Sequence, residues 1–426
     1  MAEFSATVYQ NEFLPDGGTD VHAIVTITCS GAGTAGQSGS GDAGEIVIVD
    51  TSGSMGRTRL EAAKAAASAA VQQIVDGTWF AVIAGTHVAY LAYPYARSGA
   101  GMVRMSPTTR FEALQAIAQF RSDGGTAMGT WLTLAGRLFD SIPLLAQRHA
   151  ILLTDGENHN ETPDQLSAAI AGVVGKFQCD CRGVGVDWQV AEVRRIAQAL
   201  LGTVDIIPSP EEMPAVFADL MRQSMSRGVA DAQLRVWAPQ GARVLFVRQV
   251  SPTVEDLTSR RTEVNPLTGA YPTGSWADES RDYHVAVRLA AKAIGQEQLA
   301  ARVQLAVGGA VVAQGLVKAK WSDREELTTR INPEVAHYTG QTELAEAIQE
   351  GLAAKAAGDT ETATTKLGRA VALAAATGNA EATTRLRKVV DIDDEETGTV
   401  RLKRSVDKAD EMALDTASTK TTRVRG

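Results

Sequence analysis

Apolar and polar residues follow two different periods along this chain of 426 residues. Between residues 45 and 227, short apolar runs of strand length alternate with longer segments whose apolar residues recur at helical spacing, as Leu60, Ala63 and Ala67 do. Strands separated by helices indicate an α/β fold with a mainly parallel, doubly wound, Rossmann-like sheet covered on both faces. The expected strands are 45–50, 79–84, 86–92, 149–154, 181–186 and 204–207, and the expected helices are 58–75, 108–119, 129–139, 163–175, 189–200 and 211–226.

The expected strands 79–84 and 86–92 are separated by little more than Gly85. Such a short connection favours a hairpin, because parallel strands need a much longer crossover. We therefore expect one antiparallel edge on an otherwise parallel sheet.

Two other parts of the chain show the alternation that is typical of strands with one buried face. Residues 6–28 alternate in this way, and stretches within 229–321 do so between Pro and Gly residues. A connector of Gly, Ser, Ala and Thr separates the first part from the α/β region. We therefore expect residues 1–30 and 229–321 to form one discontinuous, antiparallel, sandwich-like β domain. The α/β domain (45–227) would be inserted into it through a Gly/Ser linker (31–44).

Residues 341–388 are rich in alanine and show helical spacing, with Gly358 and Asp359 between two helices, so we expect a helical hairpin domain over 325–388. The pattern resembles a single tetratricopeptide-like hairpin, which cannot bury its apolar faces alone. This helical hairpin is therefore expected either to pack as a cap on the rest of the chain or to bind a peptide. Residues 391–426 are acidic at first and hydroxyl-rich and basic at the end, so they are expected to form a flexible tail.

The net charge of −9 argues against a general nucleic-acid binder, which would usually present a basic face. No apolar run reaches the length of about 18 residues that marks a membrane-spanning helix. The first residues lack the basic and apolar segments of a secretory signal. We therefore expect a cytoplasmic protein that binds neither nucleic acid nor membrane.

Three cysteines occur, and this odd, small number gives no disulfide framework. Cys179 and Cys181 are two residues apart in an expected strand, so their side chains lie on one face. The sequence offers no second ligand pair at the spacing of a zinc site. We therefore expect two packed side chains rather than a zinc or redox site.

The chemistry-bearing residues follow the ends of strands. Asp50, Ser52 and Ser54 come directly after the apolar run 46–49, and Gly53 lets the backbone turn so that the three side chains can converge. Hard oxygen ligands of this kind are what Mg²⁺ prefers. The carboxyl edge of an open α/β sheet is also where such folds bind ligands. Asp and Ser are common helix caps as well, which is the simpler interpretation of this stretch alone.

Two further segments extend the pattern. Thr126 lies in a glycine-rich loop before an expected helix, and Asp155 follows the apolar run 151–153. The ordered set resembles the metal-ion-dependent adhesion site of von Willebrand factor type A (VWA) domains, and the resemblance covers roughly residues 45–227. The positions that fill this motif are Asp50, Ser52, Ser54, Thr126 and Asp155.

The resemblance implies how such a site would work. In that family, the serines and the threonine touch the metal, and the carboxylates bind it directly or through water. The resemblance implies Mg²⁺, with Mn²⁺ or Ca²⁺ as alternatives, and an open position that a Glu or Asp carboxylate of a partner protein fills. Intracellular bacterial members of the family suggest a role beside an AAA+ ATPase or in a signalling assembly.

A metal hydrolase would need a general base near the ion. Asp123, Glu157 and His159 flank the predicted ligands, but each has an ordinary role available in a turn or on a loop surface. The sequence also lacks nucleophile-elbow, P-loop and HExxH motifs. We therefore expect a binding module that is not an enzyme. A scaffold with a silent metal site and a metal hydrolase are the alternatives.

The last residues of the chain offer one further hypothesis. Val424 follows Thr421 at a distance of three positions, a spacing that resembles the phosphothreonine motif read by forkhead-associated domains. Phosphorylation of Thr421 by a Ser/Thr kinase would then create a docking peptide for such a domain. The alternative is a polar, disordered end, because Thr-x-x-Val is a common sequence.

Overall fold

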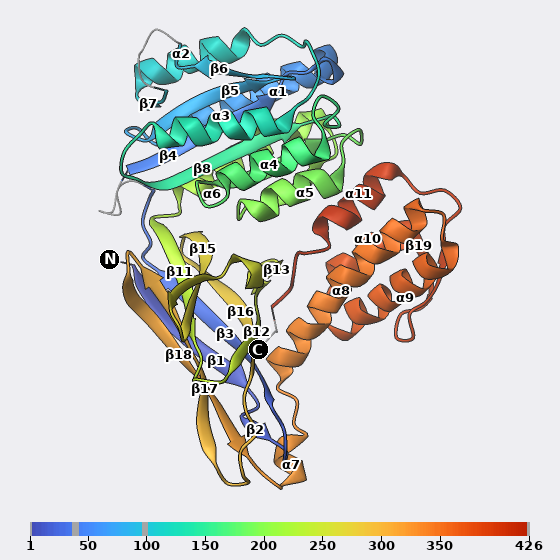
Figure 1. Cartoon of the computed structure of the whole chain (residues 1–426). Coiled ribbons are helices and arrows are strands. Elements are labelled where there is room, and N and C mark those ends of the chain that lie inside the picture. Colours follow the sequence, from blue (N-terminus) through green and yellow to red (C-terminus); the bar gives the residue numbers. More distant parts are fainter. Residues whose placement is uncertain (1, 36–41, 96–100, 424–426) are drawn as a thin grey trace. The chain divides into compact units, whose positions relative to one another are not determined.

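The computed structural model of the chain describes residues 2–35, 42–95 and 101–423 (Figure 1). It divides into two compact units. The first unit comprises Ala32–Ala230 and Gly274–Ala277, and the second comprises the remaining segments. Residues 36–41 of the predicted Gly/Ser linker (31–44) lie outside the described residues.

The first unit is built on a sheet in which most neighbouring strands run parallel. Its strands are β4 (Asp42–Asp50), β5 (Trp79–Gly85), β6 (Ala89–Tyr93), β7 (Val103–Arg104), β8 (Leu145–Thr154), β9 (Gln178–Val184) and β10 (Val204–Ile207). They lie in the order β10-β9-β8-β4-β5-β6, with β7 also paired to β5. β4 is parallel to both β5 and β8, whereas β6 is antiparallel to β5, as the short connection at Gly85 predicts.

Helices cover both faces of this sheet. They are α1 (Gly56–Gln73), α2 (Pro107–Ala118), α3 (Met128–Asp140), α4 (Pro163–Val173), α5 (Val190–Ala199) and α6 (Met213–Met225). On one face, α1, α2 and α6 pack against Val47 and Val49 of β4 in a shared apolar core. α3, α4 and α5 lie over the other face (Figure 1). β4 is consequently buried along almost its whole length, so Asp50 at its end is held by a rigid element.

The segments that enter and leave the first unit run next to each other. The Ala35 N–H donates a hydrogen bond of 2.8 Å to the Met225 carbonyl at the end of α6. Gly228 approaches Ala32 so closely that a Cβ on Gly228 would stand 1.9 Å from the Ala32 carbonyl oxygen. Only glycine fits this crossing.

The second unit contains two further sheets. Their strands are β1 (Glu3–Gln10), β2 (Phe13–Leu14), β3 (Asp20–Ser30), β11 (Val229–Trp237), β12 (Arg243–Ser251), β13 (Glu255–Asp256), β14 (Thr262–Asn265), β15 (Thr268–Trp276), β16 (Glu279–Arg288), β17 (Glu297–Val307) and β18 (Ala310–Trp321). One sheet has the order β1-β3-β16-β12-β13 and the other β14-β15-β11-β17-β18-β2. As predicted, an N-terminal strand pairs with a late one, because β3 is antiparallel to β16 along its length.

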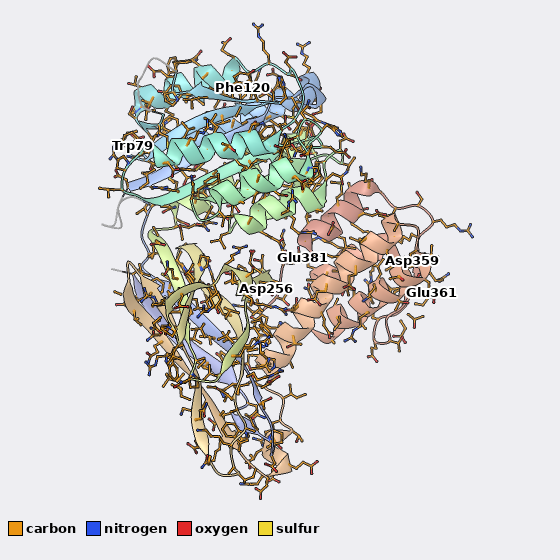
Figure 2. The ribbon with its side chains drawn as sticks, in the orientation of Figure 1. Trp79, Phe120, Asp256, Asp359, Glu361 and Glu381 are labelled. Atoms are coloured by element: carbon orange, nitrogen blue, oxygen red, sulfur yellow. The ribbon has the colours of Figure 1, made fainter. Side chains whose placement is uncertain are left out.

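Helices follow the β strands in the second unit. The elements are α7 (Glu325–Thr328), α8 (Pro333–Ala356), α9 (Thr360–Ala376), α10 (Ala380–Val389), β19 (Val390–Asp394), β20 (Thr399–Leu402) and α11 (Lys408–Ala417). Asp359, which Figure 2 labels, caps α9 by accepting a hydrogen bond of 3.0 Å from the Thr362 N–H. The predicted fold class is confirmed: an α/β domain is inserted into antiparallel sheets and is followed by helices.

The prediction of a flexible tail from residue 391 is wrong for the described residues. β19 and β20 form a hairpin, and α11 packs against α10 and α8. Val390, Val400 and Leu414 share one apolar core with α8 and α9. Each of these short elements buries only a few apolar side chains among many charged ones, so its hydropathy alone resembles that of a polar tail. Among the helices of the described ranges, none is long and apolar enough to cross a membrane.

Candidate metal centre

The two predicted ligand carboxylates lie at the same edge of the parallel sheet. Asp50 is the last residue of β4, and Asp155 follows the last residue of β8. β4 and β8 are adjacent and parallel, with Val49 beside Leu153 in the register. Both carboxylates therefore leave the sheet at its carboxyl edge, one strand apart.

Hydroxyl groups connect these carboxylates. The Ser54 Oγ lies 2.9 Å from the Ser52 Oγ and donates a hydrogen bond of 2.7 Å to Asp155 Oδ1. The Ser52 N–H donates to Asp50 Oδ1 at 2.8 Å, which fixes the turn after β4. The loop after β4 thus places Ser54 against the Asp155 carboxylate and Ser52 beside Ser54.

Thr126 reaches the same place from the loop before α3. A Cβ built on Gly156 would stand 2.9 Å from the Ser54 Oγ and 3.7 Å from the Thr126 Oγ1, so both hydroxyls lie over Gly156. The Gly53 N–H donates to the Gly124 carbonyl at 2.8 Å and ties the first loop to this second one. The structure therefore brings all the predicted ligand residues to one edge.

Asp50 is completely buried, and burial raises the pKa of its carboxyl to about 6 against the hydrogen bonds from Ser52 and Thr154. Thr154 Oγ1 donates to Asp50 Oδ2 at 2.7 Å. Thr154 was not among the residues predicted from the sequence. The feature of the sequence that could have indicated Thr154 is its position directly before Asp155, at the end of β8.

Arg59 is a second residue that the sequence analysis missed. It lies in the first turn of α1, and its Nη1 forms an ion pair of 2.8 Å with Asp155 Oδ2. Its Nη2 contacts Asp187 Oδ2 at 3.0 Å. A basic residue shortly after the Asp-x-Ser-x-Ser stretch was visible in the sequence, but its partner lies 96 residues away.

The donor set suits a small, hard cation. It consists of carboxylate and hydroxyl oxygens only, and Mg²⁺ and Mn²⁺ prefer such ligands, whereas zinc favours nitrogen and sulfur. Within the described ranges, no group of three His, Cys, Asp or Glu side chains is placed to hold a metal ion. A site here would therefore depend on Ser52, Ser54 and Thr126 as well as on the carboxylates.

The residues considered as general bases have other partners. Asp123 Oδ1 accepts a hydrogen bond of 2.8 Å from the Gly124 N–H, as expected of a turn residue. Glu157 accepts one of 2.6 Å from Gln189. His159 is exposed and pairs with Glu157 at 3.2 Å. These contacts match the ordinary roles that the sequence analysis left open for them.

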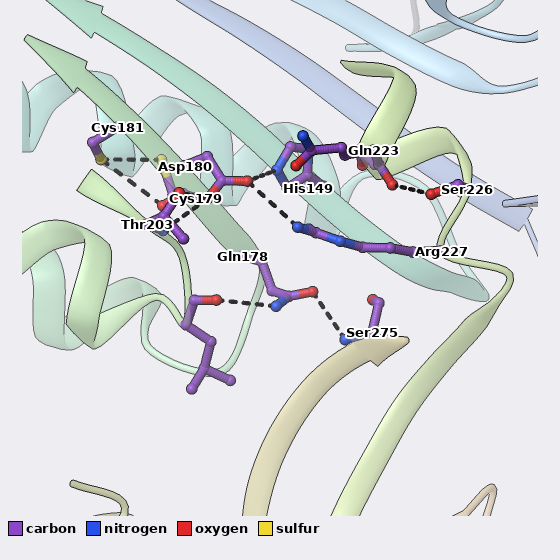
Figure 3. A network of polar contacts seen from close by, with 12 residues as sticks. His149, Gln178, Cys179, Asp180, Cys181, Thr203, Gln223, Ser226, Arg227 and Ser275 are labelled. Atoms are coloured by element: carbon purple, nitrogen blue, oxygen red, sulfur yellow. Dashed lines mark hydrogen bonds and ion pairs between the residues drawn. The ribbon is translucent and has the colours of Figure 1, made fainter. Parts of the chain in front are cut away.

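A separate network lies within the sheet, away from the carboxyl edge (Figure 3). The buried His149 of β8 contacts Glu45 of β4 at 2.8 Å and Asp180 of β9 at 2.9 Å. Burial opposes protonation of His149, but the two carboxylates outweigh it and raise its pKa to about 9. Arg227 lies 3.8 Å from Asp180. Because Glu45, His149 and Asp180 are buried, they connect neighbouring strands inside the sheet.

Cys179 and Cys181 flank Asp180 in this network. Both are buried, and their sulfur atoms lie 3.9 Å apart. The contact with Cys181, together with burial, raises the pKa of the Cys179 thiol. This matches the expected packing of two small side chains on a strand.

Thr421 does not lie in a disordered end. Its Oγ1 donates hydrogen bonds to the Val250 carbonyl at 2.7 Å and to the Pro252 carbonyl at 3.1 Å, beside β12. Val424 lies outside the described residues. Phosphorylation of Thr421 stays a prediction, and it would require these hydrogen bonds to break first.

Comparison with known proteins identifies the family. A model of the von Willebrand factor type A domain matches residues 44–206, and one of the von Willebrand factor type A C-terminal domain matches residues 372–418. A solved structure, the von Willebrand factor type A protein from Catenulispora acidiphila, is 47% identical to this chain. The structural match covers 99% of this chain and 97% of the Catenulispora chain, with a TM-score of 0.93. The chain therefore belongs to the von Willebrand factor type A family.

Two other relatives are more distant. The ArnB paralog VWA2 from Sulfolobus acidocaldarius shares the fold, with a TM-score of 0.61 at 15% identity over 98% of both chains. An uncharacterized protein of Synechocystis, sll0103, is 29% identical over 218 residues, which are 50% of this chain. The chain spans about half the length of that curated relative, because the match covers 49% of it.

Proposed function

We propose that this protein is a metal-dependent protein-binding adaptor. In this proposal Mg²⁺, with Mn²⁺ or Ca²⁺ as alternatives, is held by Asp50, Ser52, Ser54, Thr126 and Asp155. A Glu or Asp carboxylate of a partner protein completes its coordination. The observation that carries the proposal is the Ser54 hydroxyl, which lies 2.9 Å from Ser52 and 2.7 Å from Asp155 and so joins two ligand loops.

The chain's own residues would do three things in this mechanism. The buried end of β4 fixes Asp50, the hydrogen bond from Thr154 orients that carboxylate, and the hydrogen bonds between the loops keep the hydroxyls together. The bound ion would supply a Lewis-acidic position for an oxygen ligand. Because hydroxyl ligands are neutral, the protein compensates only part of the ion's charge, which favours an anionic partner. Binding of metal and of partner should then reinforce each other.

The wider role is also a proposal. A bacterial cytoplasmic protein of this kind would act beside an AAA+ ATPase or in a signalling assembly, where phosphorylated Thr421 could recruit a forkhead-associated domain. We propose no catalytic activity, since Asp123, Glu157 and His159 are engaged in turn and loop contacts.

The test begins with metal binding. Titration of Mn²⁺ into the full chain should show one site that is lost in Asp50→Ala and kept in Asp164→Ala, which removes an exposed carboxylate in the first turn of α4. Partner capture from the native host should then disappear with EDTA and in Asp50→Ala. Unchanged partners in Asp50→Ala would favour the silent scaffold. Metal-dependent turnover of an ester or phosphoester would favour the hydrolase.

A further inference from the structure

The carboxylate of Asp155 is shared between a predicted metal ligand and a positive charge. Its side chain is fully buried, and each oxygen has a partner. Oδ1 accepts the Ser54 hydroxyl at 2.7 Å, and Oδ2 accepts Arg59 Nη1 at 2.8 Å. A metal ion that uses Asp155 therefore meets a guanidinium already bound to it.

Arg59 has a second acceptor outside the buried site. Its Nη2 lies 3.0 Å from Asp187, whose side chain is 57% exposed, whereas the Arg59 side chain is 31% exposed. The guanidinium thus extends from a buried carboxylate to a surface one. It can give up the buried contact and keep an ion pair, because Asp187 remains within its reach.

We propose that Arg59 is an internal competitor for the metal. This inference rests on the proposed function. Arg59 is a positioning residue that holds Asp155 while the ion is absent and shifts toward Asp187 when the ion binds. It prevents the buried Asp155 carboxylate from standing as an uncompensated charge, which would be costly in the metal-free protein.

Charge explains the consequence for binding. The buried carboxylates of Asp50 and Asp155 carry two negative charges when ionised, and Arg59 already compensates one of them. A divalent ion leaves an excess of positive charge beside Arg59, since the exposed Asp187 is screened by water and salt. An incoming carboxylate removes that excess. Arg59 should therefore weaken binding of the metal alone and strengthen the coupling between metal and an anionic partner.

The experiment measures Mn²⁺ affinity of the full chain by calorimetry, with and without sodium acetate at constant ionic strength. Arg59→Gln and Arg59→Met remove the charge, and Arg59→Lys keeps it. Arg57→Gln is the matched control, because Arg57 is an exposed residue of the same first turn. Thermal unfolding without metal shows which variants are folded.

We expect Arg59→Gln and Arg59→Met to bind Mn²⁺ about threefold more tightly or better, while Arg59→Lys and Arg57→Gln stay near wild type. Acetate should raise the affinity of wild type more than that of Arg59→Gln. Asp187→Asn, a surface change, should weaken Mn²⁺ binding because Arg59 loses its alternative acceptor. This variant tests the proposal even where the neutral Arg59 variants do not fold.

The contrary outcomes are distinct. Equal Mn²⁺ affinity in wild type, Arg59→Gln and Arg57→Gln, or unchanged affinity in Asp187→Asn, would overturn the role of Arg59 alone and leave the proposed function intact, provided that Asp50→Ala still abolishes binding. If wild type and Asp50→Ala both fail to bind Mn²⁺, the proposed function and this inference fall together.

Discussion

Ser54 donates a hydrogen bond of 2.7 Å to Asp155 across 101 residues of sequence. Because β4 and β8 are parallel neighbours, the loops after them begin at the same edge, and a short side chain is long enough to bridge them. The contact places one hydroxyl beside both a serine and a buried carboxylate. The centre therefore depends on the register of two strands as much as on its own residues.

The Thr154 hydroxyl should contribute to stability through Asp50. Thr154→Val keeps the shape but leaves Asp50 Oδ2, in a fully buried carboxyl group, without its hydrogen bond of 2.7 Å. We expect the free energy of unfolding to fall by about 1–3 kcal/mol in urea titrations without metal. Thr154→Ser retains a hydroxyl and should lose less. Equal stability of Thr154→Val and Thr154→Ser would show that the hydroxyl does not matter.

The His149 network should make the protein less stable in alkali. The pKa of His149 rises from its ordinary value of 6.5 to about 9 in the folded chain, so the folded state holds the proton more tightly. Its stabilising contribution is complete below the unfolded pKa and is lost as the pH rises through the folded pKa. Urea titrations should therefore show a falling free energy of unfolding between about pH 7 and pH 10.

His149→Gln tests the same network at fixed pH. The substitution leaves the buried carboxylates of Glu45 and Asp180 without their shared cation, so we expect a loss of about 3 kcal/mol or more near neutral pH. The alkaline decline should also flatten. His159→Gln is the control, since His159 is exposed on a loop. A decline as steep in His149→Gln as in wild type would assign the pH effect to another group.

Arg423 should anchor residues 418–423 to β16 within the second unit. It lies 3.0 Å from Asp282, a buried carboxylate that also accepts hydrogen bonds from Thr26 and Tyr338. Arg423→Ala should lower the free energy of unfolding by about 1 kcal/mol and speed amide exchange in residues 418–423. Arg401→Ala removes an exposed ion pair and should change neither quantity measurably. Unchanged exchange in Arg423→Ala would mean that other contacts hold this segment.

Phosphorylation of Thr421 should release the same segment. A phosphate group cannot donate the hydrogen bonds that the hydroxyl gives to Val250 and Pro252, and its charge would have to be desolvated there. Thr421→Glu should therefore raise amide exchange in residues 250–254 and 418–423. Thr384→Glu, an exposed change on α10, is the control. Intact-mass analysis of protein from the native host that finds no phosphate on this segment would remove the hypothesis.

The sequence predicted the features that depend on order along the chain. Apolar runs followed by Asp50 and Asp155 located two adjacent parallel strands, and the alternation in residues 6–28 predicted their pairing with late strands. The sequence could not show side-chain contacts that depend on how neighbouring strands pair. Arg59 and Thr154 look like ordinary helix and strand residues until β4 and β8 are placed side by side. His149 lies in an apolar strand whose pattern gives no sign of the carboxylates on both neighbours.

The tail was missed for a different physical reason. β19, β20 and α11 each bury few apolar residues, and the core they complete belongs to α8 and α9. A local sequence pattern does not show which apolar side chains are buried against elements far away in the sequence. Val400 and Leu414 consequently look like isolated apolar residues in a polar stretch.

The hydrogen bond between Ala35 and Met225, with the close crossing of Gly228 and Ala32, has a practical consequence. The segments that enter and leave the inserted domain lie side by side, and domains with neighbouring termini tolerate transfer into other chains. The inserted domain could therefore be exchanged as a whole for another domain whose two ends lie equally close together. Gly228 is the position that such a graft would have to preserve.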